Sequence, residues 1–156
     1  ISAAAGESEG GIQAMLDDAA MAVMVLNGGS AVPLWNTWLD GLQEEAPEGN
    51  EIDTAGIQAI FAKALKALSD MSGAKVGDKT MMDALIPASQ AIAAYSGSDE
   101  AGLFDAAAQA ALQGAEASKQ FVSKFGRAKS YGEQTIGTPD AGAASMAYFF
   151  QGLARP

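Results

Sequence analysis

The chain has 156 residues and a formal net charge of -10, from nine Lys and Arg against nineteen Asp and Glu, and it contains neither cysteine nor histidine. Their absence excludes disulfides, thiolate zinc sites, His-ligated metals and Ser-His-Asp triads within these residues. The acidic balance argues against a nucleic acid or an anionic membrane as partner, because a polyanion needs a basic footprint.

Length and patterning predict one all-α domain. Alanine is abundant, β-branched residues are sparse, and no window alternates between apolar and polar residues as a strand would. We expect residues 1–10 to form a flexible N-terminal segment and residues 11–156 to form one helical domain. No apolar stretch approaches the roughly 20 residues of a membrane span and no signal peptide is visible, so we expect a cytoplasmic protein. The first residue is Ile rather than Met, which favours an N-terminally incomplete chain.

The first half of the chain predicts three helices. Apolar residues at steps of three and four indicate a helix over 11–27, which Asn27-Gly28-Gly29 ends. Ser30 is a candidate cap for a second helix with a heavy apolar face around Trp35 and Trp38. Asp53 or Thr54 begins the third helix, after an acidic loop that contains proline.

The second half predicts three more helices, so that the chain forms a bundle of about six. Thr80 leads a helix in which Pro87 removes one backbone hydrogen bond. The span from Glu100 to about Lys124 is expected to form one long alanine-rich helix. Residues 126–137 are predicted to form a polar, glycine-rich loop of functional length. Thr138-Pro139-Asp140 then supplies a cap, a first-turn proline and an acid for the last helix.

Three helix starts are polar and contain glycine: Gly28-Gly29-Ser30, Gly77-Asp78-Lys79-Thr80 and the block from Gly126 to Ser145. Free N–H groups and the helix dipole make such starts suitable for anions. Each of the first two is also explained as a capped turn, by Ser30 in the first case and by Asp78 or Thr80 in the second. The second lacks the spacing of glycine before Lys-Thr that a Walker loop requires. Arg127 adds a planar fork suited to phosphate. Together these features outline a nucleotide site, with Met81 as a candidate adenine contact.

Taken in order, Gly28 to Trp35, Gly77 to Pro87 and Gly126 to Ser145 resemble the nucleotide-binding subunit or domain of dihydroxyacetone kinases, the DhaL type. The resemblance implies an antiparallel barrel of helices that holds ADP or ATP at one end and phosphoryl transfer to dihydroxyacetone or a similar short ketose. A separate ketose-binding subunit or domain of the DhaK type would hold that ketose covalently on a histidine. It stays open whether ATP is the donor or a phosphocarrier protein recharges bound ADP, and whether the chain forms a homodimer.

The positions that match the family's motifs are the nucleotide contacts that the resemblance implies for this chain. The resemblance places Ser30 and Ala31 at the phosphates, Gly73 and Met81 at the adenine, and Arg127 within reach of the nucleotide as a candidate contributor to catalysis. The full set of nucleotide-binding residues implied in this way is Gly29, Ser30, Ala31, Gly73, Thr80, Met81, Arg127, Asp140, Ala141 and Gly142.

Two departures from the family pattern affect function. Ser30 comes one place early and Ala31-Val32 replace Ser-Gly, which removes a hydroxyl near the phosphates. The family's upstream Gly-Asp-x-Asp-x-Gly loop, whose aspartates hold magnesium, is not found, and Asp17 and Asp18 point apart on their predicted helix. We therefore assign no metal ligand, although magnesium neutralises charge in phosphoryl transfer. Either the chain is incomplete at its N-terminus or it is a non-catalytic binding or regulatory module.

Overall fold

A computed structural model describes residues 10–155, and these residues form six α-helices and two 3₁₀ helices. No strand occurs within this range, so the predicted all-α fold class is confirmed. The predicted flexible segment, residues 1–10, lies outside the described residues except for Gly10. In chain order the elements are α2 (Ile12–Met24), α3 (Ala31–Gln43), α4 (Thr54–Ser72), α5 (Met82–Ala94), α6 (Glu100–Ala117), η1 (Ser118–Gln120), η2 (Arg127–Thr135) and α7 (Ala141–Leu153).

The chain divides into two compact units, Ile1–Ser72 and Gly73–Pro156. The prediction that residues 11–156 form one domain stays a prediction. Across the described part of the chain, no helix is both long enough and apolar enough to cross a membrane.

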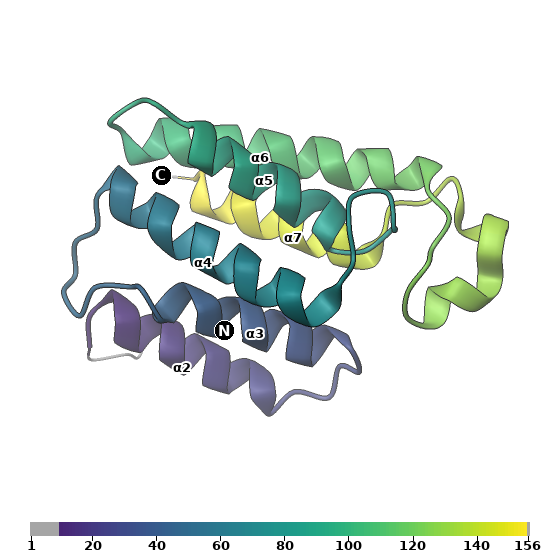
Figure 1. Cartoon of the computed structure of the whole chain (residues 1–156), viewed down its shortest axis with the longest axis horizontal. Coiled ribbons are helices and arrows are strands. Elements are labelled where there is room, and N and C mark those ends of the chain that lie inside the picture. The colour runs from purple at the N-terminus through teal and green to yellow at the C-terminus, as the bar shows by residue number, and fades with distance from the viewer. Residues whose placement is uncertain (1–9, 156) are drawn as a thin grey trace. The chain divides into compact units, whose positions relative to one another are not determined.

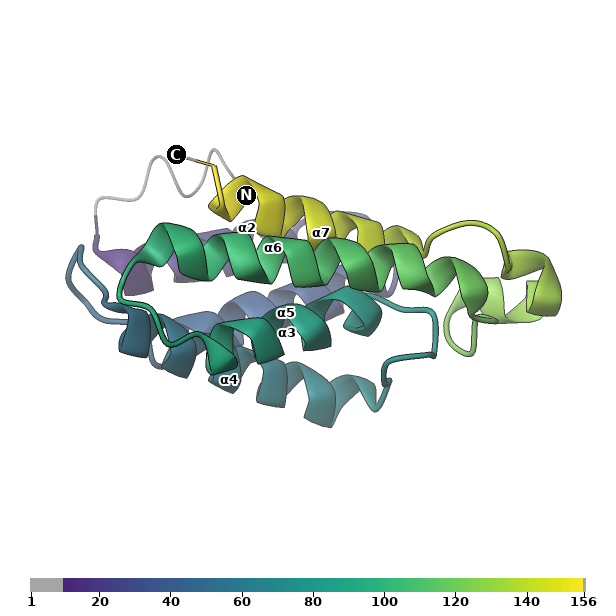
Figure 2. The same cartoon turned by 90° about the horizontal axis from the view of Figure 1, so that it is seen from above.

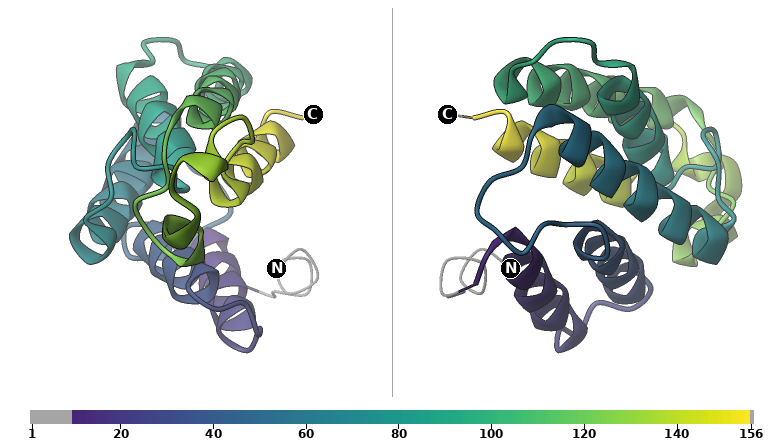
Figure 3. Two further views of the ribbon diagram at one scale, coloured as in Figure 1. Left: turned by 90° about the vertical axis from the view of Figure 1, so that its right-hand side faces the viewer. Right: turned by 60° about the vertical axis from the view of Figure 1, so that its left-hand side comes forward.

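In the first unit, α3 packs against both α2 and α4 (Figure 1; Figure 3, right). Trp38 of α3 is fully buried, and its ring meets that of Phe61 edge-on with the centroids 5.9 Å apart. Gly41 allows the close approach of α3 and α4, because a Cβ added there would lie 2.8 Å from the Cα of Ala64. The apolar stripes seen in the sequence therefore form the core of this unit.

In the second unit, α6 packs against both α5 and α7 (Figures 1 and 2). The tightest glycine contact is at Gly114, where an added Cβ would collide with the carbonyl oxygen of Asp83. Pro87, four residues after Asp83, has no N–H to donate to that carbonyl. The largest fully buried apolar side chains here are Met82, Leu85, Ile92, Leu103, Met146 and Phe150.

Two segments differ from the sequence-based expectation after α6. The helix predicted from Glu100 to about Lys124 ends at Ala117, and η1 follows it. The Ser118 hydroxyl donates to the carbonyl of Ala115 at 2.6 Å, a local bond that competes with continued α-helix. The segment 126–137, predicted as an irregular loop, contains η2 with a break at Gly132, whose φ is +53°. Residues 118–140 extend beyond the ends of α6 and α7 (Figures 1 and 2).

Two helices begin later than predicted. α5 begins at Met82 rather than at Thr80, and α7 begins at Ala141. Asp140, not Thr138, is the N-cap of α7, because its carboxylate accepts the N–H of Ala143 at 2.9 Å. The proline at 139 therefore precedes the helix.

Candidate nucleotide-binding site

The turn before α3 is the part of the predicted site that lies in the first unit. Gly29 has a φ of +58°, and the N–H of Ala31 donates to the carbonyl of Gly28 at 3.3 Å. Ser30 occupies the N-cap position but has helical backbone angles, and its side chain makes no cap hydrogen bond, so the prediction that it caps α3 is wrong. Residues 28–31 are all exposed. The start of α3 is thus an open turn without a capping side chain.

The loop before α5 is held by two carboxylates. Fully buried Asp83 accepts the N–H of Gly77 at 2.6 Å and that of Thr80 at 2.7 Å. Asp78 accepts the N–H of Lys75 at 2.8 Å and pairs with the Lys124 ammonium at 2.7 Å. The bond from Lys124 and the N–H of Lys75 lower the pKa of Asp78. The backbone is therefore fixed before α5 begins.

Of the two predicted caps of α5, the Thr80 hydroxyl accepts the N–H of Met82 at 3.2 Å, whereas Asp78 binds its own loop and Lys124. The bond between the Thr80 N–H and Asp83 is one half of a capping box. Sequence reasoning missed Asp83, although an acid three residues after a threonine is the pattern that indicates it.

Lys79, noted in the sequence only for its place beside helix starts, is 5% exposed. Its ammonium donates to the carbonyl oxygens of Ser118 and Thr138, each at 2.6 Å. These bonds join the loop before α5 to the end of α6 and to the approach to α7. No local pattern in the sequence could have shown this contact, since the partners lie 39 and 59 residues away.

The start of α7 lies against the same loop. The N–H of Asp140 donates to the Ser118 hydroxyl at 2.8 Å. A Cβ added to Gly142 would lie 3.2 Å from both the Cβ and the nitrogen of Met81, which is itself 5% exposed. Burial raises the pKa of Asp140, against the opposing effect of backbone N–H donors at the helix start. Met81, Asp140 and Gly142 are thus brought together.

Other predicted residues occupy exposed positions. Arg127 is exposed at the first position of η2, and its guanidinium makes no ion pair or hydrogen bond with another residue of the described range 10–155. Gly73, with a φ of +65°, and Gly126, with a φ of +61°, have open surroundings, since a Cβ added to either would meet nothing within 4 Å. Ala141 is also exposed.

The described residues contain no group of three or more Asp or Glu side chains that could hold a metal ion.

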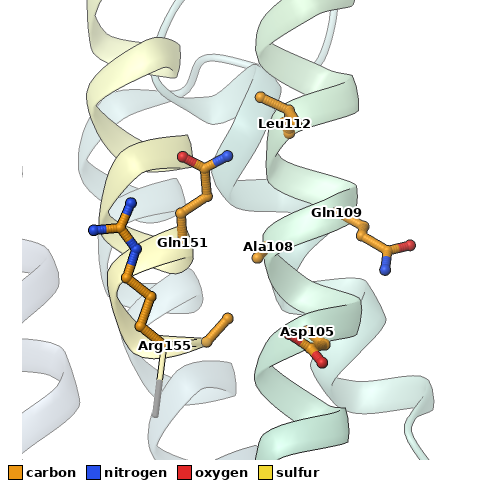
Figure 4. A pocket seen from close by; sticks show the side chains of 7 residues that line it. Asp105, Ala108, Gln109, Leu112, Gln151 and Arg155 are labelled. Atoms are coloured by element: carbon orange, nitrogen blue, oxygen red, sulfur yellow. The ribbon is translucent and has the colours of Figure 1, made fainter.

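A hollow of about 350 Å³ lies between α6 and α7 (Figure 4) and includes none of the predicted nucleotide-binding residues. Its lining comes from Asp105, Ala108, Gln109, Leu112, Gln151, Ala154 and Arg155.

Comparison with known proteins identifies the family. The sequence profile described as the DAK2 domain matches residues 1–155. The chain belongs to the DAK2 domain family. The DhaL-type resemblance expected from the three motifs is therefore confirmed.

Several relatives are named as kinases of erythrulose or dihydroxyacetone, or as subunits of such kinases. The chain is 36% identical over 148 residues to D-erythrulose kinase of Mycolicibacterium smegmatis, a match that covers 93% of this chain and 26% of that protein. It is 27% identical over 135 residues to the ADP-binding subunit DhaL of a PEP-dependent dihydroxyacetone kinase of Listeria innocua, which covers 86% of this chain and 62% of that subunit. The chain spans about a quarter of the length of the erythrulose kinases that it matches.

A solved structure has the same fold. It is the dihydroxyacetone kinase from C. freundii in complex with AMP-PNP and Mg2+, with a TM-score of 0.61 and 24% sequence identity. The match covers 92% of this chain and 23% of the kinase chain. This chain therefore has the fold of the matched part of that kinase chain.

Proposed function

We propose that this DAK2 domain is the nucleotide-binding part of a kinase that transfers a phosphoryl group from ATP, or from a bound and recharged adenine nucleotide, to a short ketose. The observation that carries the proposal is the 36% identity to an erythrulose kinase across 93% of the chain. A second erythrulose kinase, from Pectobacterium atrosepticum, is 34% identical over 90% of the chain. Erythrulose and dihydroxyacetone are the ketoses to test first.

The residues of the second unit have chemistry that fits an adenine nucleotide. Met81, which is 5% exposed, packs against Gly142, so this part of the proposed site is apolar, which suits a flat base. The backbone at Gly73 and Gly126 is free of neighbours within 4 Å of an added Cβ, which leaves room for a ligand to approach. Arg127 supplies an exposed guanidinium for phosphate oxygens.

In the first unit, the open turn at Gly29, Ser30 and Ala31 supplies backbone at a helix start, where the dipole favours an anion. The bound nucleotide supplies the phosphoryl group, and this chain's residues position it and stabilise its charge. The described residues do not fit magnesium, so we assign no step to that ion.

The ketose would be bound elsewhere. The chain has no histidine, so a histidine that holds the ketose carbonyl would have to come from a partner subunit or domain of the DhaK type. A phosphocarrier protein is a second candidate partner, because the Listeria relative is named as PEP-dependent.

The alternative function is a non-catalytic DhaL-like module that binds a nucleotide or regulates a partner. It is favoured by one observation, the lack of a carboxylate cluster for a metal ion among residues 10–155. The two functions differ in turnover rather than in nucleotide binding.

Calorimetric titration of the 156-residue chain with ADP, with and without magnesium, tests the proposal first. Saturable binding of one ADP per chain supports it, and no binding overturns it. Turnover of dihydroxyacetone or erythrulose with ATP and an added DhaK-type subunit then separates the kinase from the non-catalytic module, for which we expect ADP binding without turnover.

A further inference from the structure

Lys79 combines three unfavourable features at one position. Its φ is +58°, a left-handed conformation that L-residues other than glycine rarely adopt. The residue is 5% exposed, although a buried ammonium loses its hydration. Its charge is met by two carbonyl oxygens and by no direct ion pair within residues 10–155. Backbone strain and a buried charge persist together only where the surrounding structure requires them.

The two carbonyls bound by Lys79 lie at the base of the 118–140 segment. Ser118 follows α6, and Thr138 stands two residues before the N-cap of α7. The carbonyls at the end of a helix carry partial negative charge, so an ammonium is a suitable partner for Ser118. A further bond, from the N–H of Gly137 to the carbonyl of Lys119 at 2.8 Å, closes the same base. Lys79 thus joins both ends of the segment that carries Arg127.

The contacts of Lys79 lead directly to the candidate nucleotide contacts. Ser118 also receives the N–H of Asp140 on its hydroxyl, and Asp140 caps the first turn of α7. Gly142, in that turn, lies against Met81, two residues after Lys79. The lysine side chain therefore fixes the spacing between Met81 and the first turn of α7.

We propose that Lys79 is a positioning residue for the nucleotide: it sets the start of α7 against Met81 and does not itself touch the phosphates. The inference rests on the proposed function, since it concerns the same site. Its competitor is a direct role, in which a lysine beside a helix start pairs with phosphate as a point charge. The burial of Lys79 and its two carbonyl partners favour the positioning role.

Adenosine and ADP distinguish the two roles, because they share the base and differ in the phosphates. Lys79→Met keeps an unbranched apolar stem but removes all N–H donors. If Lys79 positions the site, this variant binds both ligands less tightly. We expect adenosine to lose roughly tenfold, because small misplacements of binding groups are costly, and ADP to lose at least as much, because the segment held by Lys79 also carries Arg127. If Lys79 binds phosphate, only the affinity for ADP falls.

Lys66→Met is the matched control, because it removes the same charge from an exposed lysine of α4 that pairs with Asp70. We expect its affinities for both ligands to equal those of the unaltered chain. Hydrogen exchange adds a readout without nucleotide: Lys79→Met should speed exchange of the amides of Gly137, Asp140 and Ala143, and Lys66→Met should not. Circular dichroism confirms that each variant is folded at the temperature used.

Ser118→Ala is a second variant in case Lys79→Met does not fold. It removes the acceptor of the Asp140 N–H and leaves the carbonyl that Lys79 binds, so we expect a smaller loss of affinity, again for both adenosine and ADP. A loss confined to ADP, or unchanged affinity in a folded variant, overturns the inference. If the unaltered chain binds neither ligand, the proposed function itself is overturned and the positioning role falls with it.

Discussion

The turn before α3 and the loop before α5 are both glycine-containing helix starts, yet they are built differently. In the first, residues 28–31 are exposed, and Ser30 makes no cap hydrogen bond. In the second, the buried side chains of Asp83 and Lys79 form hydrogen bonds with backbone groups from three segments of the chain. Similar sequence patterns therefore produce one start that is open and one that is fixed by buried polar groups.

The difference indicates two ways of preparing a helix start for a ligand. An open start keeps its backbone groups for the ligand but contributes little to stability. A fixed start uses its polar groups internally, so that its apolar and glycine positions are presented in a defined geometry. We expect substitutions at the fixed start to change stability strongly, and substitutions at the open start to change ligand affinity alone.

Asp83→Asn should have the largest effect on stability. The amide keeps one acceptor oxygen but places an NH2 donor against a backbone N–H, so that one buried donor loses its acceptor. A hydrogen bond to a charged group contributes about 1.5 to 3 kcal/mol, and we expect a loss in this range from urea denaturation. Asp70→Asn, the same change in an exposed i,i+4 pair of α4, should cost less than about 0.5 kcal/mol. Equal losses in the two variants would contradict the fixed start.

Gly114→Ala tests the packing that supports Asp83 from α6. The new methyl group would collide with the Asp83 carbonyl oxygen, so that α5 and α6 must separate. Overpacking costs about 1 to 3 kcal/mol, and the higher helix propensity of alanine offsets up to about 1 kcal/mol. Gly152→Ala in α7, where nothing lies within 4 Å, is the control and should be neutral or stabilising. If thermal unfolding shows that Gly114→Ala stabilises the chain as much as Gly152→Ala does, the close contact between Gly114 and the Asp83 carbonyl is not present in solution.

The sequence predicted the elements better than it predicted the contacts between them. Apolar spacing, caps and alanine-rich composition together predicted the six α-helices found within residues 10–155. Asp53 or Thr54 was expected at the start of α4, where Thr54 is the first residue and Asp53 accepts the N–H of Gly56. The missed features depend on tertiary partners. Ser118 follows the end of α6, and its carbonyl accepts a hydrogen bond from Lys79, which lies 39 residues earlier in the chain. The spacing of apolar residues reports only on neighbours in the chain, so it cannot predict a hydrogen bond between residues this far apart.

Asp140→Asn should change the pH dependence of stability. Burial raises the pKa of Asp140 above its ordinary value, so the stability linked to its protonated form is present at low pH and is lost as pH rises through the raised pKa. Asparagine caps a helix but does not titrate. The variant should therefore become more stable relative to the unaltered chain as pH rises from acid to neutral. The measurement is urea denaturation at several pH values.

Asp78→Asn is the control of opposite sign. Its partners lower the pKa of Asp78, so its stabilising effect is present above the unfolded pKa and is lost as pH falls through the folded one. This variant should therefore lose stability relative to the unaltered chain as pH rises. Parallel pH profiles for the two variants would contradict the difference between these two carboxylates.

Ser30→Ala should have the smallest effect on stability. The Ser30 side chain makes no cap hydrogen bond, so we expect a change within about 0.5 kcal/mol, as for surface substitutions in general. Asp99→Ala is the matched control at α6, because the Asp99 carboxylate accepts the N–H of Gly102 at 2.6 Å, and loss of such a cap costs about 1 kcal/mol. If Ser30 contacts a nucleotide phosphate, Ser30→Ala weakens ADP binding at unchanged stability, and Asp99→Ala lowers stability at unchanged affinity. The reverse pattern would mean that the turn before α3 is a structural cap and not an open site.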